Sequence, residues 1–176
     1  MEQKPDTATF AGGCFWCMEP AFEALGGIIS VAAGYTGGTM PSPTYEDVSS
    51  GATGHVEAVQ IIYDASKVTY DQLLDIFWQN IDPTQADGQF ADHGPQYRTA
   101  IFYHTDEQKQ LAEASKVTLA QSGKFTKPIV TSVEPASPFH PAEEYHQDYA
   151  KKNPLRYKLY KTGSGREGFL KKTWNH

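Results

Sequence analysis

The two cysteines of the chain lie in the segment GGCFWCMEP, residues 12–20, where Phe15 and Trp16 separate Cys14 from Cys17. If Cys14 lies where a strand turns into a helix, the positive end of the helix dipole favours its thiolate, which is the nucleophilic form of cysteine. Residues three apart share one helix face, and this spacing permits a disulfide after a small local adjustment. The pair can therefore cycle between a dithiol and a disulfide.

The cysteine pair also fits roles outside redox cycling. The two residues could be buried structural cysteines on a helix face. They could also bind zinc together with His140 and His146, although the two halves of this set are far apart in the sequence, unlike those of a zinc finger. A third alternative is a hydrolase in which Cys14, His93 and Asp92 form a Cys-His-Asp site.

A candidate acid lies in the segment HVEAVQIIYD, residues 55–64, which predicts a strand because it is rich in β-branched residues. Glu57 has apolar neighbours on both faces of this strand. Burial there disfavours the charged carboxylate and raises its pKa, so Glu57 could act as a general acid near neutral pH. The alternative is a glutamate at a sheet edge that faces water.

Two irregular segments could complete a pocket. Residues 34–55 are rich in Gly, Pro, Ser and Thr, and residues 86–98 show no regular periodicity. Long loops within a compact domain are often functional. Tyr45 and Tyr97 lie in these segments, and each could donate a hydrogen bond into a pocket or pack in the core with its hydroxyl at the surface.

The hydrophobic periodicity and the turn residues predict an alternating order of elements. We expect strands at 7–12, 28–35, 55–64, 98–104 and 128–136, and helices at 17–27, 69–79, 106–121 and 142–152. The first six elements match an α+β, ferredoxin-like (split βαβ) two-layer sandwich, to which further helices and long functional loops are added. The residues after Asn153 show little pattern. Residues 1–176 have the usual size of a single domain.

The composition excludes several classes of protein. A net charge of −6 argues against nucleic acid as a partner. The apolar runs are too short to span a membrane, and the first residues lack the apolar segment of a signal peptide. Two cysteines are too few for a secreted disulfide framework. We therefore expect a cytoplasmic protein.

Six sequence blocks occur in a fixed order: GGCFWCMEPAF, GYTGG, PTYEDV, GHVEAVQIIYD, DHGPQYRTAI and PFHPAEEYHQDY. From about Phe10 to Tyr149 this combination resembles the type A methionine sulfoxide reductases. The resemblance implies thiol-dependent reduction of the S epimer of methionine sulfoxide, free or in proteins. It also implies thioredoxin as the reductant, a role in protein repair under oxidative stress, and neither a cofactor nor a metal.

The resemblance also implies roles for individual residues. Cys14 is the nucleophile that becomes a sulfenic acid, and Glu57 is the general acid. Many members resolve the sulfenic acid with cysteines in a C-terminal tail that this chain lacks, whereas members with GCFWC carry a thiol at the position of Cys17. We therefore expect a Cys14–Cys17 disulfide. The other implied site residues are Phe15 and Trp16 around the substrate methyl group, Tyr45 and Tyr97 at the sulfoxide oxygen, Asp92 in the same site, and His146 and Tyr149 in its outer shell.

Overall fold

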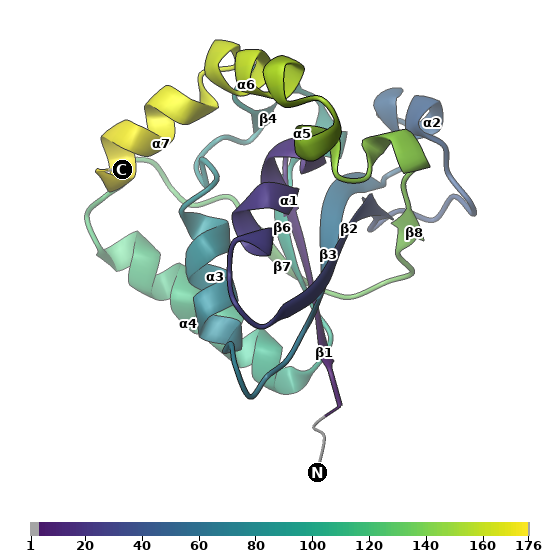
Figure 1. Ribbon diagram of the computed structural model, residues 1–176. Helices are drawn as coiled ribbons and strands as arrows, with labels where there is room; N and C mark the ends of the chain where they lie inside the picture. Colours follow the sequence, from purple (N-terminus) through teal and green to yellow (C-terminus); the bar gives the residue numbers. More distant parts are fainter. Residues whose placement is uncertain (1–3, 176) are drawn as a thin grey trace.

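A mixed six-stranded sheet lies at the centre of the computed structural model, which describes residues 4–175 (Figure 1). Its order is β7-β6-β1-β3-β2-β8, and every neighbouring pair is antiparallel except β6 and β7. The strands are β1 (Asp6–Gly12), β2 (Ile28–Thr36), β3 (Val56–Tyr63), β6 (Thr99–Tyr103), β7 (Ser132–Pro135) and β8 (His140–Pro141). A separate hairpin pairs β4 (Gly88–Gln89) with β5 (Asp92–His93).

Helices link and cover these strands. The helices before β7 are α1 (Phe15–Glu23), α2 (Tyr45–Ser49), α3 (Tyr70–Trp78) and α4 (Asp106–Gln121). Short 3-10 turns occupy Pro95–Tyr97 and Glu144–His146, and the chain ends with α5 (Tyr149–Lys152), α6 (Pro154–Gly163) and α7 (Arg166–Trp174). The α+β class expected from the sequence is therefore confirmed. No helix within residues 4–175 is both long enough and apolar enough to cross a bilayer.

The main core lies between the sheet and helices α1, α3 and α4. Phe10 of β1 is fully buried at its centre, and its ring stacks on Phe22 of α1 at 5.3 Å and on Phe77 of α3 at 5.1 Å between centroids. A smaller apolar cluster forms on the opposite face of the sheet, where Phe139 covers it. The parts of β1 and β3 that lie between these two clusters are thus buried on both faces.

The C-terminal third differs from the expectation. The predicted helix at 142–152 is wrong: a 3-10 turn ends at His146, and α5 starts only at Tyr149 because Asp148 adopts a left-handed conformation with φ of 53°. The residues after Asn153, which show little pattern, form α6 and α7. Pro154 suits the first position of a helix. However, α6 buries no residue and α7 buries few, so neither helix has an apolar face that periodicity would reveal.

Truncation of Phe10 should test the core that carries the site. We expect Phe10→Ala to lower the free energy of unfolding by about 3–5 kcal/mol, because it removes a buried ring and leaves a cavity. Ile29→Ala is the matched control: Ile29 is 58% exposed, and its truncation should cost less than about 0.5 kcal/mol. Chemical denaturation measures both, and an equally small loss in the two variants would contradict this view of the core.

Candidate active site

The turn between β1 and α1 fixes the position of Cys14. Cys14 is the N-cap residue of α1, and its carbonyl accepts a hydrogen bond from the N–H of Cys17 at 3.1 Å. Gly13 has a left-handed φ of 82°, and a Cβ there would come within 2.6 Å of the Gln89 side chain. A glycine is therefore required directly before Cys14. The expected strand-to-helix turn at the cysteine is confirmed.

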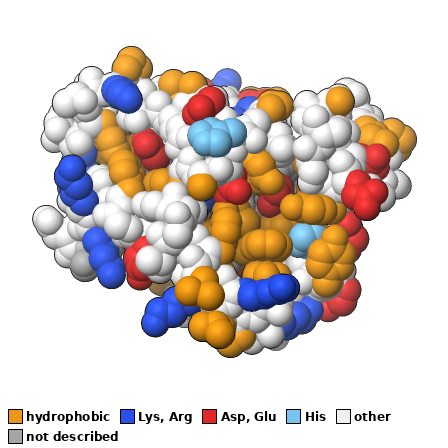
Figure 2. Space-filling model, turned by 90° about the horizontal axis from the view of Figure 1, so that it is seen from above, with side chains coloured by type: hydrophobic (Ala, Val, Ile, Leu, Met, Phe, Trp, Pro, Cys, Tyr) orange, Lys and Arg blue, Asp and Glu red, His pale blue; other side chains and the backbone are white. Residues whose placement is uncertain are grey.

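Cys14 opens onto a small cavity of ≈ 50 Å³ beyond the end of β1. Figure 2 shows the molecule from this end, where acidic side chains lie among hydrophobic ones near the middle of the face. The residues that line the cavity are Cys14, Phe15, Trp16, Tyr45, Glu57, Asp92, Tyr97 and Tyr160. All of them except Tyr160 were expected at the site. The other three expected residues, Cys17, His146 and Tyr149, lie outside this lining.

Glu57 lies beneath the first turn of α1. It belongs to the central strand β3 and is 3% exposed, so the alternative of a water-facing glutamate at a sheet edge is wrong. One carboxylate oxygen accepts a hydrogen bond from the N–H of Phe15 at 3.3 Å. Burial raises the pKa of Glu57 to about 8, although this hydrogen bond and one from Tyr97 act in the opposite direction. The carboxyl group is therefore protonated at neutral pH and can donate a proton.

The two thiols ionise differently from the expectation. Burial raises the pKa of Cys14, and its hydrogen bond to Cys17 raises it further. The expected thiolate at the start of the helix is therefore wrong for the resting enzyme, because the loss of water outweighs the dipole of a short helix. The hydrogen bond from Cys14 lowers the pKa of Cys17 to about 7, and the charges of Arg166 and Lys161 act in the same direction.

His146 and Tyr149, the two residues expected in the outer shell, both contact Trp16. Its ring stacks on Tyr149 with centroids 3.8 Å apart, and its indole N–H donates to Nδ1 of His146 at 3.0 Å. His146 is 1% exposed, and burial lowers its pKa. A neutral imidazole can accept the indole hydrogen bond. His146 and Tyr149 thus fix the orientation of an aromatic wall of the cavity.

The two tyrosines from the irregular segments meet at the cavity. Tyr45 starts α2, and its N–H donates to Glu143 at 3.1 Å, while Tyr35 of β2 donates its hydroxyl to the same carboxylate at 3.0 Å. Tyr97 follows β5 and forms a hydrogen bond with Glu57. Burial raises the pKa of both Tyr45 and Tyr97. Both phenols therefore keep their protons and can donate hydrogen bonds.

The sequence interpretation missed Tyr160. This residue of α6 donates its hydroxyl to Asp92, and its ring meets Trp16 edge-on with centroids 5.8 Å apart. A usable signal was present in NPLRYKLY, residues 153–160. There a proline suited to a helix start precedes Tyr157 and Tyr160, which are three residues apart and so share one helix face.

The residues of the hydrolase alternative are not brought together. Asp92 lines the cavity with Cys14, but His93 is exposed and its ring nitrogen lies 3.2 Å from a carboxylate oxygen of Asp87. A base that points away from the nucleophile cannot activate it.

The zinc alternative fails for a similar reason. The His140 ring packs against His55 with centroids 5.3 Å apart, and His146 is engaged by Trp16. Within residues 4–175, three or more His, Cys, Asp and Glu ligand atoms come within 4.8 Å of one another only at Glu19, Glu23 and Asp148. Lys151 already pairs with two of these carboxylates.

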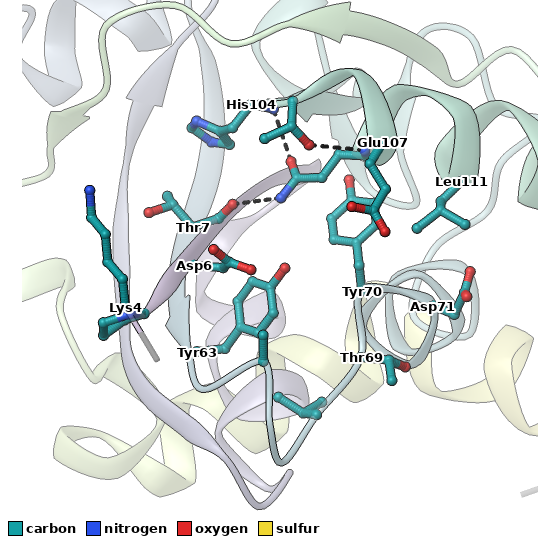
Figure 3. A pocket seen from close by; sticks show the side chains of 15 residues that line it. Lys4, Asp6, Thr7, Tyr63, Thr69, Tyr70, Asp71, His104, Glu107 and Leu111 are labelled. Atoms are coloured by element: carbon teal, nitrogen blue, oxygen red, sulfur yellow. Dashed lines mark hydrogen bonds between the residues drawn. The ribbon is translucent and has the colours of Figure 1, made fainter. Parts of the chain in front are cut away.

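A larger cavity of ≈ 710 Å³ lies at the opposite end of β1 (Figure 3). Tyr63, Tyr70 and His104 line it, and Gln108 bridges to the carbonyl of Thr7 at 2.8 Å. None of the residues that line this cavity is a cysteine or an expected site residue. The small cavity at Cys14 is therefore the candidate active site, because it combines a thiol with a proton donor.

Comparison with known proteins agrees with this site. The family model described as peptide methionine sulfoxide reductase matches residues 6–176. The peptide methionine sulfoxide reductase MsrA of Bacillus licheniformis is 58% identical over 174 residues, which cover 99% of this chain and 96% of that protein.

Two solved structures of Mxr1 from Saccharomyces cerevisiae are also similar. Its reduced form has a TM-score of 0.78 and 34% identity, covering 86% of this chain and 87% of that chain. Its complex with Trx2 has a TM-score of 0.56 and 28% identity, covering 84% and 86% of the two chains. The chain therefore belongs to the type A peptide methionine sulfoxide reductases, the family that its six sequence blocks resemble.

Proposed function

We propose that this chain reduces the S epimer of methionine sulfoxide, free or in proteins, and that thioredoxin restores the enzyme. The observation that carries the proposal is the small cavity in which the thiol of Cys14 and the protonated carboxyl of Glu57 lie together. Sulfoxide reduction requires a nucleophile for the sulfur and an acid for the oxygen. This cavity offers both groups within aromatic walls.

In the proposed reaction, the sulfur of Cys14 attacks the sulfoxide sulfur while Glu57 protonates the oxygen. Tyr45 and Tyr97 donate hydrogen bonds to that oxygen as it gains negative charge. The thiol of Cys14 gives up its own proton as its new bond forms, and the carboxylate of Glu57, which has just lost a proton, accepts it. The new S–S bond then breaks as the hydroxyl group passes from the substrate sulfur to the Cys14 sulfur, so that methionine leaves and Cys14 becomes a sulfenic acid. The substrate sulfur is thereby reduced, and the Cys14 sulfur oxidised, by one electron pair.

The walls of the cavity account for the proposed preference for one epimer. Phe15 and Trp16 form an apolar cage for the substrate methyl group, while Glu57 receives the oxygen. When the methyl group and the oxygen occupy these positions, one of the two configurations at the sulfur directs the rest of the methionine toward solvent. Support for the cage comes from the stacking of Trp16 on Tyr149 and its hydrogen bond to His146. Asp92, held by Tyr160, completes the polar side.

We further propose that Cys17 resolves the sulfenic acid by forming a disulfide with Cys14. Both thiols are free and buried, and a hydrogen bond joins them. Their proximity supports this pairing. A dithiol reductant would then reopen the disulfide. The solved complex of the yeast relative Mxr1 with Trx2 supports thioredoxin in this role.

The proposal extends to the fold class and the domain organisation. Strand β3 lies between β1 and β2 and is antiparallel to both, while α1 connects β1 to β2. This arrangement supports a ferredoxin-like (split βαβ) class for the core of β1, β2, β3 and β6. We also propose that residues 1–176 form a single methionine sulfoxide reductase domain.

Separated epimers test the proposed function directly. A peptide that contains methionine S-sulfoxide should be reduced with thioredoxin or dithiothreitol as the electron donor, and the R-sulfoxide peptide should not. Chromatography of the products measures both reactions. Cys14→Ser is the control and should abolish turnover. Equal turnover of the two epimers would contradict the proposed cage, and ester hydrolysis without a reductant would favour the hydrolase alternative.

The oxidised form can be identified by mass spectrometry. After the enzyme reacts with substrate in the absence of a reductant, we expect its mass to fall by that of one hydrogen pair as the Cys14–Cys17 disulfide forms. In Cys17→Ser the sulfenic acid should persist and react with a dimedone probe. A stable sulfenic acid in the wild-type enzyme, with no disulfide, would refute Cys17 as the resolving thiol.

Substitution of Glu57 tests the proton donor. Glu57→Gln should slow methionine formation in a single turnover by roughly 10²–10⁴-fold, the usual contribution of a general acid. Burial raises the pKa of Glu57 to about 8. The acid is therefore protonated below that pH, and the wild-type rate should fall as the pH rises through this value. The variant should lack this fall, whereas an unchanged rate in Glu57→Gln would assign the proton to water or to a tyrosine.

A further inference from the structure

Arg166, at the start of α7, is a buried cation without an acidic partner. It is 2% exposed, and its guanidinium donates to the carbonyl oxygens of Asn80 at 2.6 Å and Gly12 at 3.0 Å. Within residues 4–175, no ion pair joins it to an aspartate or glutamate. A buried charge that lacks a counter-charge is costly. A negative group of another kind is therefore expected beside it.

The guanidinium of Arg166 lies against the turn that carries both thiols. One of its nitrogens is 3.8 Å from the sulfur of Met18, directly after Cys17. The other is 3.0 Å from the point where a Cβ would project from Gly13, directly before Cys14. Arg166 thus contacts both ends of the cysteine segment from beneath the cavity, and its charge favours the ionised form of Cys17.

We propose that Arg166 is the counter-charge of the resolving thiol: it stabilises the Cys17 thiolate and so activates Cys17 to attack Cys14 once Cys14 has been oxidised. Arg166 is therefore a positioning residue that acts through Cys17 and does not touch the substrate. This inference rests on the proposed function, because it concerns the second step of that reaction.

Several other groups face Cys17, and their balance explains why Arg166 matters at this step. From α6, Tyr157 forms a hydrogen bond with Cys17 and Lys161 adds a second positive charge. Asp92 contributes opposing negative charge, whereas Glu57 is protonated at neutral pH and contributes none. In the reduced enzyme, the hydrogen bond from the S–H of Cys14 lowers the pKa of Cys17 more than any other group does. Oxidation of Cys14 removes that S–H, whereas the charge of Arg166 remains.

The proposed step balances without another reactant. The thiolate sulfur of Cys17 attacks the sulfenic sulfur of Cys14, so that an S–S bond forms and the S–O bond breaks. The oxygen leaves as hydroxide and takes up one proton to become water. This proton balances the one that Cys17 released when it ionised. The sulfur of Cys17 is oxidised, and that of Cys14 is reduced, by the same amount.

The first measurement follows the ionisation of Cys17 in the Cys14→Ser background, which retains a hydroxyl donor. The rate of alkylation by iodoacetamide is followed as a function of pH, because the thiolate is the reactive form. Arg166→Gln keeps an N–H donor but removes the charge. We expect it to raise the midpoint by about one pH unit, which is a roughly tenfold smaller thiolate fraction below the midpoint.

Matched variants separate charge from structure. Arg166→Lys should keep a midpoint near that of the parent, and Arg166→Met should raise it as Arg166→Gln does. Lys158→Met removes a positive charge from the exposed side of α6 and should leave the midpoint unchanged. Circular dichroism checks the fold of each variant, and either uncharged substitution of Arg166 suffices for the test. An unshifted midpoint in a folded, uncharged variant would overturn the proposal.

The second measurement is a single turnover of enzymes that retain both cysteines, without a reductant. Arg166→Gln should release methionine at the wild-type rate. Its disulfide should form roughly threefold more slowly at about pH 6, because the loss of thiolate is partly offset by greater nucleophilicity. Above about pH 9, where Cys17 is ionised in both enzymes, only the greater nucleophilicity remains, and the variant should form its disulfide about threefold faster than the wild type. Normal methionine release with unchanged disulfide formation would refute the role of Arg166, whereas no methionine release from the wild type would refute the proposed function itself.

Discussion

The hydrogen bond from the N–H of Phe15 to the carboxyl of Glu57 joins the first turn of α1 to the central strand β3. The active site depends on this contact, because it brings the segment with the thiols over the carboxyl group of Glu57, which is buried in the sheet. Burial by both layers raises the pKa of Glu57 to about 8, so the acid is protonated in its resting state. In the proposed reaction, Glu57 donates this proton to the sulfoxide oxygen.

The same burial that favours the proton donor weakens the nucleophile. Removal of water raises the pKa of Cys14 as it does that of Glu57. The site thus keeps both groups protonated until a substrate arrives. Protonation of the sulfoxide oxygen makes the sulfoxide sulfur more susceptible to attack. Proton donation by Glu57 therefore compensates for the low ionisation of the Cys14 thiol. Cys17, which faces Arg166 and Lys161, has the more acidic thiol of the pair.

The C-terminal third of the chain completes a site whose reactive groups come from the N-terminal third. It wraps over the end of the sheet where α1 begins, as α5 and α6 show in Figure 1. From it come His146 and Tyr149 behind Trp16, and Tyr160 against Asp92. Arg166 adds a buried charge beneath the thiols. This segment carries no cysteine of its own, so its contribution is to shape the cavity and the charge around the two thiols.

The sequence by itself determined the central strands, the helices that cover them and most residues of the cavity. Continuous apolar runs, helical periodicity and compact motifs mark these parts, since β1 and β3 are buried along most of their length and α3 buries apolar side chains along one face. The tertiary structure decided the course of the chain after Asp148, and with it the position of Arg166. Helices α6 and α7 bury too few residues to leave a pattern. The tertiary structure also decided the pKa of Cys14, because burial by elements distant in sequence outweighs the local helix dipole that the sequence reveals.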